Sequence, residues 1–447
     1  MARAVAARRV KAIAAVAFSA LLALTGPAFA APGASPGEGF DVEHYRVELQ
    51  PDLKSGEVTG KQTVVLRATQ EGLAEIAFSP NALQIDPSAI ASEGWTFVAD
   101  EKAYRFLPPE PLAKGQAAVL FFTFSGTPAR GTTLLDTGLY TGYFGCDWMV
   151  CLQDSPGDKA TFALDLLVPP GTATLGPGNR IAVHPDRSGL ERHSWGHPWP
   201  VSPYLFAFAA GDFVARGDGA AIRILASGPD IAIPPGHAEA TADMATFFAG
   251  KAGFGLPTGT YTQLLVPGSA AQESAGFSAI GTRWLERERD DPGSAWVVAH
   301  ELAHEWWGNS ITCESWRHFW LNEGFATFMV AAWKEHSMGA DAYAREIGIF
   351  ERRRAQLVEA GWDKPLAWDG DYPSLGVRRG VQYSKGALFL HTLRETMGDE
   401  AFWDGVRSYS QAHRGGTVTS EDFQRTMEAA SGRDLGALFD QWVFAGG

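Results

Sequence analysis

Residues 300–328 read HELAHEWWGNSITCESWRHFWLNEGFATF, and this stretch decides how the rest of the chain is interpreted. On a helix, positions four apart lie on one face, so His300 and His304 can bind one metal ion. Glu323, with eighteen residues between it and His304, can supply an anionic third ligand. Two imidazoles and one carboxylate, with a fourth position for water, are typical of a catalytic zinc site. The stretch therefore predicts one Zn2+ per chain, bound by His300, His304 and Glu323.

Glu301 lies between the two histidines and points to another side of the same helical turn, beside the metal. Zinc lowers the pKa of its bound water, and a neighbouring carboxylate can take the proton and later return it to a leaving amine. This predicts a zinc hydrolase with Glu301 as its general base. In the alternative interpretation, the two histidines only pack, and the Glu323 carboxylate only interacts favourably with the dipole at the N-terminus of a helix.

Further motifs make the chain resemble the M1 family of zinc metallo-aminopeptidases, which are gluzincins of the aminopeptidase N type. The ligand spacing and the WLNEGFA segment at 320–326 match that family, and the similarity extends over nearly the whole mature chain. Three other segments resemble family motifs, namely DSP at 154–156, YLFAF at 204–208 and YSKGA at 383–387. The resemblance implies an aminopeptidase that acts on peptides with a free N-terminus, in which the Tyr383 hydroxyl stabilises the oxyanion.

The resemblance also suggests where a substrate binds. The family carries a Gly-x-Met-Glu-Asn stretch, and residues 270–274 of this chain read AAQES at the corresponding place. By the resemblance, Glu273 binds the free α-amine, and Ala271 and Gln272 lie along the substrate. Because the glycine, methionine and asparagine of the family stretch are replaced here, the preference for the first residue of the substrate stays open. Residues 140–145, YTGYFG, stand where family members often place a further Gln or Glu amine ligand, so no residue there is assigned.

Two other functional classes remain as alternatives at this stage. One is a related zinc hydrolase with altered specificity, such as an endopeptidase or an epoxide hydrolase. The other is an inactive peptide-binding protein, against which the intact metal-binding and base residues argue. A requirement for a free amino terminus distinguishes the aminopeptidase from these alternatives.

The N-terminal segment predicts export. Basic residues precede an apolar run at 12–24, and a small-x-small end follows at 28–30, the layout of a signal peptide cleaved near Ala30. The mature protein is then expected in the periplasm or secreted, without stable membrane insertion. Cleavage lowers the basic residues from 37 to 33 against 51 acidic ones, a net charge of −18, which argues against nucleic acid as a partner. A monomer is expected, and larger assemblies are left open.

The fold class expected is α+β with several domains. Residues 1–30 are the signal peptide, 31–38 a flexible leader, 39–217 an N-terminal antiparallel β domain and 218–447 the catalytic domain. The resemblance makes the first domain saddle-like and the second thermolysin-like and mainly helical. Helices are expected at 238–249, from 292 through both histidines to Gly308-Asn309, and at 321–336, 340–360, 385–397, 401–413 and 420–430.

Two remaining features concern the cysteines and the C-terminus. Cys146 and Cys151 can form a disulfide or remain free, and the spacing alone does not decide between the two. Cys313 is expected to be a small buried residue. The chain ends at Gly447, about where the catalytic domain of the family ends, which implies a short form without the helical C-terminal domain.

Overall fold

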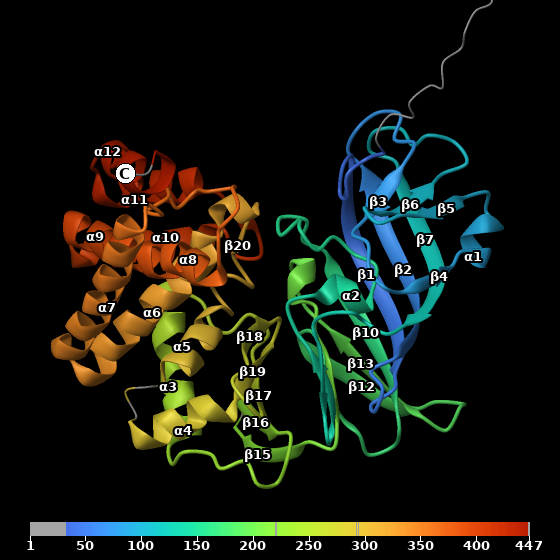
Figure 1. Ribbon diagram of the computed structural model, residues 1–447, viewed down its shortest axis with the longest axis horizontal. Coiled ribbons are helices and arrows are strands. Elements are labelled where there is room, and N and C mark those ends of the chain that lie inside the picture. Colours follow the sequence, from blue (N-terminus) through green and yellow to red (C-terminus); the bar gives the residue numbers. More distant parts are fainter. Residues whose placement is uncertain (1–32, 220, 292, 294, 446–447) are drawn as a thin grey trace, which may run out of the picture. The chain divides into compact units, whose positions relative to one another are not determined.

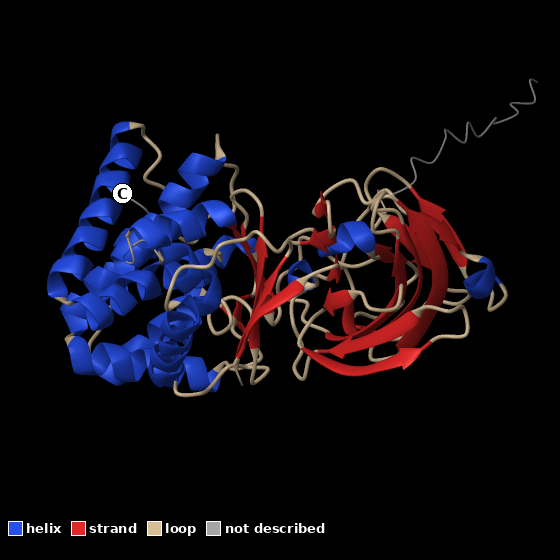
Figure 2. Cartoon of the chain, turned by 90° about the horizontal axis from the view of Figure 1, so that it is seen from below, coloured by secondary structure: helices blue, strands red, loops and turns tan. Residues whose placement is uncertain are grey.

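The computed structural model describes residues 33–445 apart from residues 220, 292 and 294. Strands dominate the first half of this range and helices the second (Figures 1 and 2). The predicted fold class, α+β with a β domain followed by a mainly helical domain, is confirmed. The predicted signal peptide lies outside the described residues. Within the described part of the chain, no helix is both long and apolar enough to span a bilayer.

The first half contains three sheets. The largest has the order β12-β13-β10-β1-β2-β7-β4, and the others are β3-β6-β5 and β11-β14-β9-β8. Their strands are β1 (Phe40–Pro51), β2 (Val58–Ala68), β3 (Ile76–Phe78), β4 (Gln84–Asp86), β5 (Thr96–Ala99), β6 (Tyr104–Leu107), β7 (Ala117–Gly126), β8 (Thr132–Leu135), β9 (Gly138–Thr141), β10 (Thr161–Val168), β11 (Ala173–Leu175), β12 (Asn179–Pro185), β13 (Glu191–Gly196) and β14 (Ala209–Gly211). Short helices α1 (Ser88–Ala91), α2 (Gly145–Trp148) and η1 (Pro203–Leu205) join them. One pair departs from the expected antiparallel pattern, since β1 and β10 run parallel.

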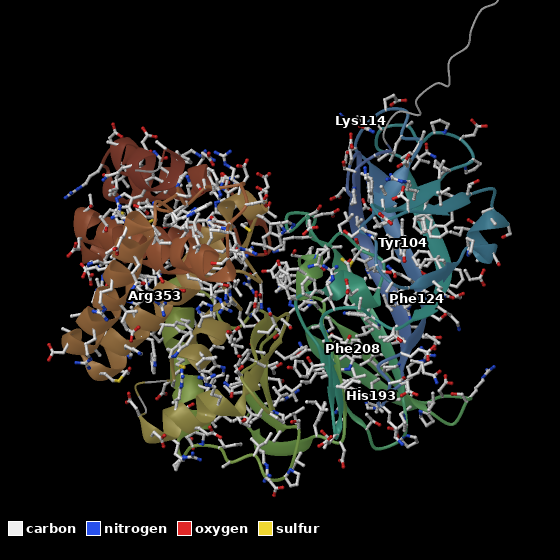
Figure 3. The ribbon with its side chains drawn as sticks, viewed as in Figure 1. Tyr104, Lys114, Phe124, His193, Phe208 and Arg353 are labelled. Atoms are coloured by element: carbon white, nitrogen blue, oxygen red, sulfur yellow. A yellow bond between two sulfur atoms is a disulfide. The ribbon has the colours of Figure 1, made fainter. Side chains whose placement is uncertain are left out.

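The core of this half follows the alternation of its strands. Tyr45, Val47 and Leu49 on β1 are fully buried, because alternate side chains of a strand point to the same face. Aromatic rings fill the space behind them. Phe162 stacks on Phe206 at 4.1 Å, and Phe208, labelled in Figure 3, packs edge-on against a buried tryptophan.

Cys146 and Cys151 form a disulfide around α2, which resolves the two possibilities that the sequence left open. Cys313 is free and buried, as expected. The start of the described chain is tied to the β domain rather than free, because the Gly37 amide donates to Ala77 O at 2.9 Å.

The second half begins with a five-stranded sheet that the sequence analysis did not predict. Its order is β15-β16-β17-β19-β18, with β15 (Val214–Asp218), β16 (Ile222–Ala226), β17 (Tyr261–Val266), β18 (Ala271–Ser274) and β19 (Phe277–Gly281). Strands β16, β17 and β19 are parallel, and β18 returns antiparallel along the edge. Every residue of β17 and β19 is buried, so these strands lack the alternation by which a half-exposed strand is recognised.

Helices make up the rest of this half, coloured from yellow to red in Figure 1. They are α3 (His237–Ala252), α4 (Thr282–Asp290), α5 (Trp296–Ala303), α6 (Trp320–Met338), α7 (Ala340–Glu359), α8 (Leu375–Arg379), α9 (Gly386–Met397), α10 (Asp399–Ala412), α11 (Ser420–Ser431) and α12 (Gly436–Phe439). The segments η4 (Gly380–Lys385) and η5 (Asp440–Phe444) are π-helical, and η3 (Trp316–His318) is a 3-10 turn. Strands β20 (Thr312–Cys313) and β21 (Thr417–Val418) form a short parallel pair.

The helix that carries the metal-binding motif is shorter than predicted. Helix α5 begins at Trp296, so Asp291 does not cap it and instead accepts a hydrogen bond from the Gly293 amide. It ends at Ala303 rather than at Gly308, and His304 stands just beyond its last turn with helical backbone angles. Because His304 continues the helical turn, His300 and His304 still lie on the same face.

Candidate metal centre and active site

The structure brings the three predicted metal ligands together. His300 Nε2 and His304 Nε2 lie 3.2 Å apart. Glu323 Oε2 lies 3.3 Å from the first and 3.4 Å from the second. All three side chains are buried, with 6%, 1% and 4% of their surface exposed. Helix α5 supplies the histidines and the first turn of α6 supplies Glu323, so two packed helices build the triangle.

These separations fit a tetrahedral zinc ion. Four ligands about 2.0–2.1 Å from a tetrahedral ion lie about 3.3 Å from one another, and the three measured distances bracket that value. Glu323 Oε2 is buried and has no hydrogen-bond partner among the described residues, as expected of an oxygen that serves a cation. The donor set of two imidazoles and one carboxylate also matches that of catalytic zinc sites.

A backbone carbonyl prepares His304 as a ligand. Its Nδ1 lies 3.1 Å from Trp307 O, and a carbonyl can only accept a hydrogen bond. Nδ1 therefore carries a hydrogen, so Nε2, which faces the other ligands, is the nitrogen that can bind a metal. Glu305 and Asn322 lie near the histidines in sequence, but they accept hydrogen bonds from the backbone amides of Gly276 and Cys313.

The centre favours positive charge. Burial lowers the pKa of His304, but the carboxylates of Glu323 and Glu273 outweigh it and raise the pKa to about 10. Burial also raises the pKa of Glu301, and the neighbouring Glu273 raises it further. Three buried carboxylates thus surround two histidines, and a divalent cation can balance their charge.

Glu301 and Glu273 face the same space from different elements. A carboxylate oxygen of each lies within 4.8 Å of the other and of a nitrogen of His304. Glu301 Oε2 is buried without a hydrogen-bond partner in the described part of the chain, so this oxygen is available to a water molecule or a substrate. The second carboxylate, Glu273, comes from β18 and is also buried.

Hydrogen bonds hold the turn after Glu273 against the end of α5. Glu305 Oε1 accepts from the Gly276 amide at 3.1 Å and from Asn309 Nδ2 at 3.3 Å. The same Asn309 group donates to Ser274 O at 3.0 Å. Glu305 therefore positions the strand that carries Glu273, a role that its place in the sequence did not suggest.

Tyr383 lies on η4, beside the metal ligands. Its ring is nearly parallel to that of His300, at 5.7 Å and 12°. Burial, the carboxylates of Glu323 and Glu273 and a hydrogen bond with Glu323 raise the pKa of Tyr383 well above its ordinary value, so the hydroxyl keeps its proton and can donate it in a hydrogen bond. π-Helical turns of this kind are frequent at functional sites.

Two basic side chains, one exposed and one buried, support the turn that carries Tyr383. Arg353, labelled in Figure 3, donates to Ser384 Oγ at 3.2 Å. Lys385 lies in a stretch that was expected to begin a helix, and its side chain is fully buried and pairs with Asp363 at 2.7 Å. The helix period does not reveal this ion pair, because Asp363 lies on a distant loop.

The β domain also contributes to the surroundings of the site, through a residue that no motif indicated. Tyr143, in the segment left unassigned, has a φ of 48°, a conformation that is uncommon for a residue with a side chain. Its ring packs against Tyr204 and Trp316, at 5.9 and 6.4 Å. Asp147, an acid two residues beyond that segment, pairs with Arg130 at 2.8 Å. The unassigned segment therefore reaches the catalytic half through Tyr143 rather than through an acid.

Known proteins resemble the chain in both sequence and fold. Residues 239–442 match the peptidase family M1 domain. Aminopeptidase N of Streptomyces lividans is 29% identical over 321 residues, which are 66% of this chain and 36% of that protein. Aminopeptidase N of Lactococcus lactis subsp. lactis is 24% identical over 453 residues, which are 91% of this chain and 51% of the relative. The chain thus spans about half or less of the length of these relatives.

A solved structure shares the whole described fold. A mutant of the M1 zinc metallopeptidase from Deinococcus radiodurans superposes with a TM-score of 0.76 at 22% identity, covering 93% of this chain and 96% of that one. This likeness extends from the β domain through the helical half, whereas the family domain covers the helical half alone. Residues 239–442 thus match peptidase family M1 in sequence, and the described chain shares its fold with a solved M1 zinc metallopeptidase.

Proposed function

We propose that the chain is a zinc aminopeptidase that hydrolyses the first peptide bond of peptides with a free N-terminus. The observation that carries this proposal is the position of Glu273, whose carboxylate faces the metal ligands and Glu301 from an edge strand. A buried anion at a set distance from the reacting centre selects an ammonium group, and so it selects the end of a chain rather than its middle.

Zinc, held by His300, His304 and Glu323, would supply a bound water of lowered pKa and would polarise the scissile carbonyl. Glu301 takes one proton from the attacking water and returns it to the leaving nitrogen as the C–N bond breaks. The Tyr383 hydroxyl donates a hydrogen bond to the oxyanion of the tetrahedral intermediate. Glu273 accepts hydrogen bonds from the α-ammonium group of the substrate.

The edge strand β18 suggests how the peptide backbone binds. Among the described strands, β18 pairs only with β19. Its other edge can therefore pair with an extended substrate, and the backbone of Ala271 and Gln272 would line that edge. This arrangement supports peptides as the substrate class.

A panel of fluorogenic aminoacyl amides tests this function. Each amide is assayed with a free and an N-acetylated amino group, with and without a zinc chelator. We expect hydrolysis of the free forms only, loss of activity with chelator and recovery when Zn2+ is restored. Equal hydrolysis of both forms would instead indicate an endopeptidase and would remove Glu273 from its role. No hydrolysis by the zinc-loaded protein would favour a binding protein.

We also propose that the mature protein acts outside the cytoplasm as a monomer. The Cys146–Cys151 disulfide supports an oxidising compartment, where such bonds persist. Sequencing the N-terminus of the exported protein should find Ala31 as its first residue. A protein that retains residues 1–30 and stays in the cytoplasm would contradict this proposal.

A further inference from the structure

The side chain of Gln272 folds back onto the carboxylate of its neighbour. Gln272 Nε2 donates to Glu273 Oε2 at 2.5 Å and lies 3.3 Å from Glu273 O. Consecutive residues of a strand normally point to opposite faces, so this contact requires the glutamine to curl around the strand. A charge-assisted hydrogen bond of this length restricts the orientation of the carboxylate that faces His304 and Glu301.

A glycine of the β domain provides the space for this conformation. A Cβ atom placed on Gly142 would lie 3.0 Å from Gln272 Cγ, 3.8 Å from its Cβ and 4.0 Å from its Cδ. The methylene groups of Gln272 therefore lie directly against the backbone of Gly142. Any larger residue at position 142 would compete with Gln272 for the same space.

The segment around Gly142 is held in place by its own hydrogen bonds. The Gly142 amide donates to Gly131 O at 3.0 Å, and Gln153 Nε2 donates to Tyr143 O at 2.9 Å. Tyr143 keeps its left-handed backbone conformation within this frame. Gly142 thus presents a fixed surface against which Gln272 packs.

We propose that Gln272 is a positioning residue of the amine-binding site, where its side-chain amide orients the Glu273 carboxylate towards the substrate ammonium group and Gly142 leaves the room that this requires. An ammonium group has three N–H donors, and a carboxylate held in one orientation offers its free lone pairs to them without rearranging. This inference rests on the proposed aminopeptidase function and assigns a chemical role to a residue that differs from the family pattern.

Gln272→Leu removes the amide and keeps most of the side-chain volume. We expect it to raise the KM for a free aminoacyl amide about 10-fold, with a smaller change in kcat, because a lost hydrogen bond to a charged group weakens binding by about that factor. The preference for free over N-acetylated substrate should fall by a similar factor. Zinc content and the unfolding temperature should match the wild type.

Gly142→Ala tests the same contact from the other side, with Gly228→Ala as its matched control. A Cβ on Gly228 would meet no atom within 4 Å, so we expect wild-type kinetics from the control. Gly142→Ala should raise KM as Gln272→Leu does. The double variant should be no worse than the poorer single variant, because both act through one contact.

The outcomes separate this inference from the proposed function. A wild type that does not discriminate between free and acetylated amides refutes the aminopeptidase proposal itself. A discriminating wild type whose Gln272→Leu and Gly142→Ala variants keep its KM and its preference overturns the role of Gln272 alone. Loss of zinc or of folding in both variants would assign Gln272 a structural role and would also overturn the inference.

Discussion

At the scale of single residues, the metal centre combines satisfied and unsatisfied groups. The carbonyl of Trp307 accepts from His304 Nδ1, which leaves Nε2 free for the metal. In contrast, Glu301 Oε2 and Glu323 Oε2 are buried and have no hydrogen-bond partner among the described residues. Leaving a buried polar oxygen unpaired costs about 1–3 kcal/mol, and more when the group is charged. A cation and a water molecule bound at these oxygens would offset this cost.

Glu301→Gln separates the base from the ligands. We expect this variant to retain zinc and to lose several orders of magnitude in kcat, because an amide cannot take a proton from water. His300→Ala should instead lose the metal. Metal analysis of the purified variants together with amide hydrolysis measures both effects. Glu286→Gln, on the exposed side of α4, is the control. Near wild-type turnover by Glu301→Gln would show that another group activates the water.

Tyr383→Phe tests the oxyanion role. The phenylalanine keeps the ring beside His300 and the packing against Phe319, so the fold should be unchanged. Loss of one oxyanion donor lowers kcat by about 10²–10³-fold, with little change in KM. Steady-state kinetics on a free aminoacyl amide measures the effects on kcat and on KM separately. An increase in KM at unchanged kcat would assign the hydroxyl to substrate binding instead.

At the scale of elements, two glycines bring the Tyr383 segment close to Glu323. Gly324 on α6 and Gly386 on α9 approach so closely that a Cβ on Gly324 would lie 3.0 Å from Gly386 Cα. Glu323 immediately precedes one glycine, and Tyr383 lies three residues before the other. The helix contact therefore sets the distance between Glu323 and Tyr383, the proposed metal ligand and the proposed oxyanion donor.

Gly324→Ala should disturb this contact. The added methyl group meets backbone atoms, which cannot move aside without shifting a helix, so we expect a loss of about 1–3 kcal/mol in unfolding free energy and a lower kcat. Gly348→Ala on α7 is the control, because its Cβ would meet only the end of a flexible arginine side chain at 3.4 Å. That variant should be neutral or slightly stabilised. Urea unfolding compares the stabilities of the two variants. Equal stabilities would mean that α6 and α9 can move apart without a loss of unfolding free energy.

At the scale of the whole molecule, a buried lysine links distant parts of the chain. Lys159, just before β10, donates to Ser310 O at 2.7 Å, Gly416 O at 3.1 Å and Asn309 O at 3.3 Å. Two of these carbonyls follow the metal-binding helix, and the third precedes β21. An ammonium group has three donors, so three carbonyls satisfy it. The β domain thereby supports the turn that ends the metal-binding motif.

The neighbouring Asp158 should make stability depend on pH. Burial raises its pKa to about 7, while its carboxylate accepts from the Val42 amide at 3.1 Å. The folded state therefore binds a proton that the unfolded state releases near pH 4, so this contribution to stability is present below pH 4 and is lost as the pH rises through 7. Asp158→Asn should be more stable than the wild type at pH 8 and similar to it at pH 4.

Urea unfolding between pH 4 and pH 8 measures the difference in unfolding free energy between Asp158→Asn and the wild type. Other titrating groups cancel in this difference, because both proteins contain them. Asp212→Asn, at an exposed position, should leave the pH dependence of the wild type unchanged. A constant difference between Asp158→Asn and the wild type from pH 4 to 8 would contradict the assignment.

Local patterns in the sequence were sufficient to predict most of the metal centre. The i, i+4 spacing of His300 and His304 depends only on helix geometry, and the structure keeps that spacing although α5 ends early. The alternation along β1 likewise predicted its buried face. The five-stranded sheet escaped prediction because β17 is buried on both faces, and a short apolar run has no period that separates a strand from a helix.

The sequence by itself therefore determined the fold class, the ligand types and their local spacing, because these follow from periodicity within one helix or strand. Only the tertiary structure decided which distant residues meet. It placed Gly142 against Gln272 and Lys385 against Asp363, and it paired Cys146 with Cys151. Such contacts depend on how separate elements pack, and no local period of the sequence records that packing.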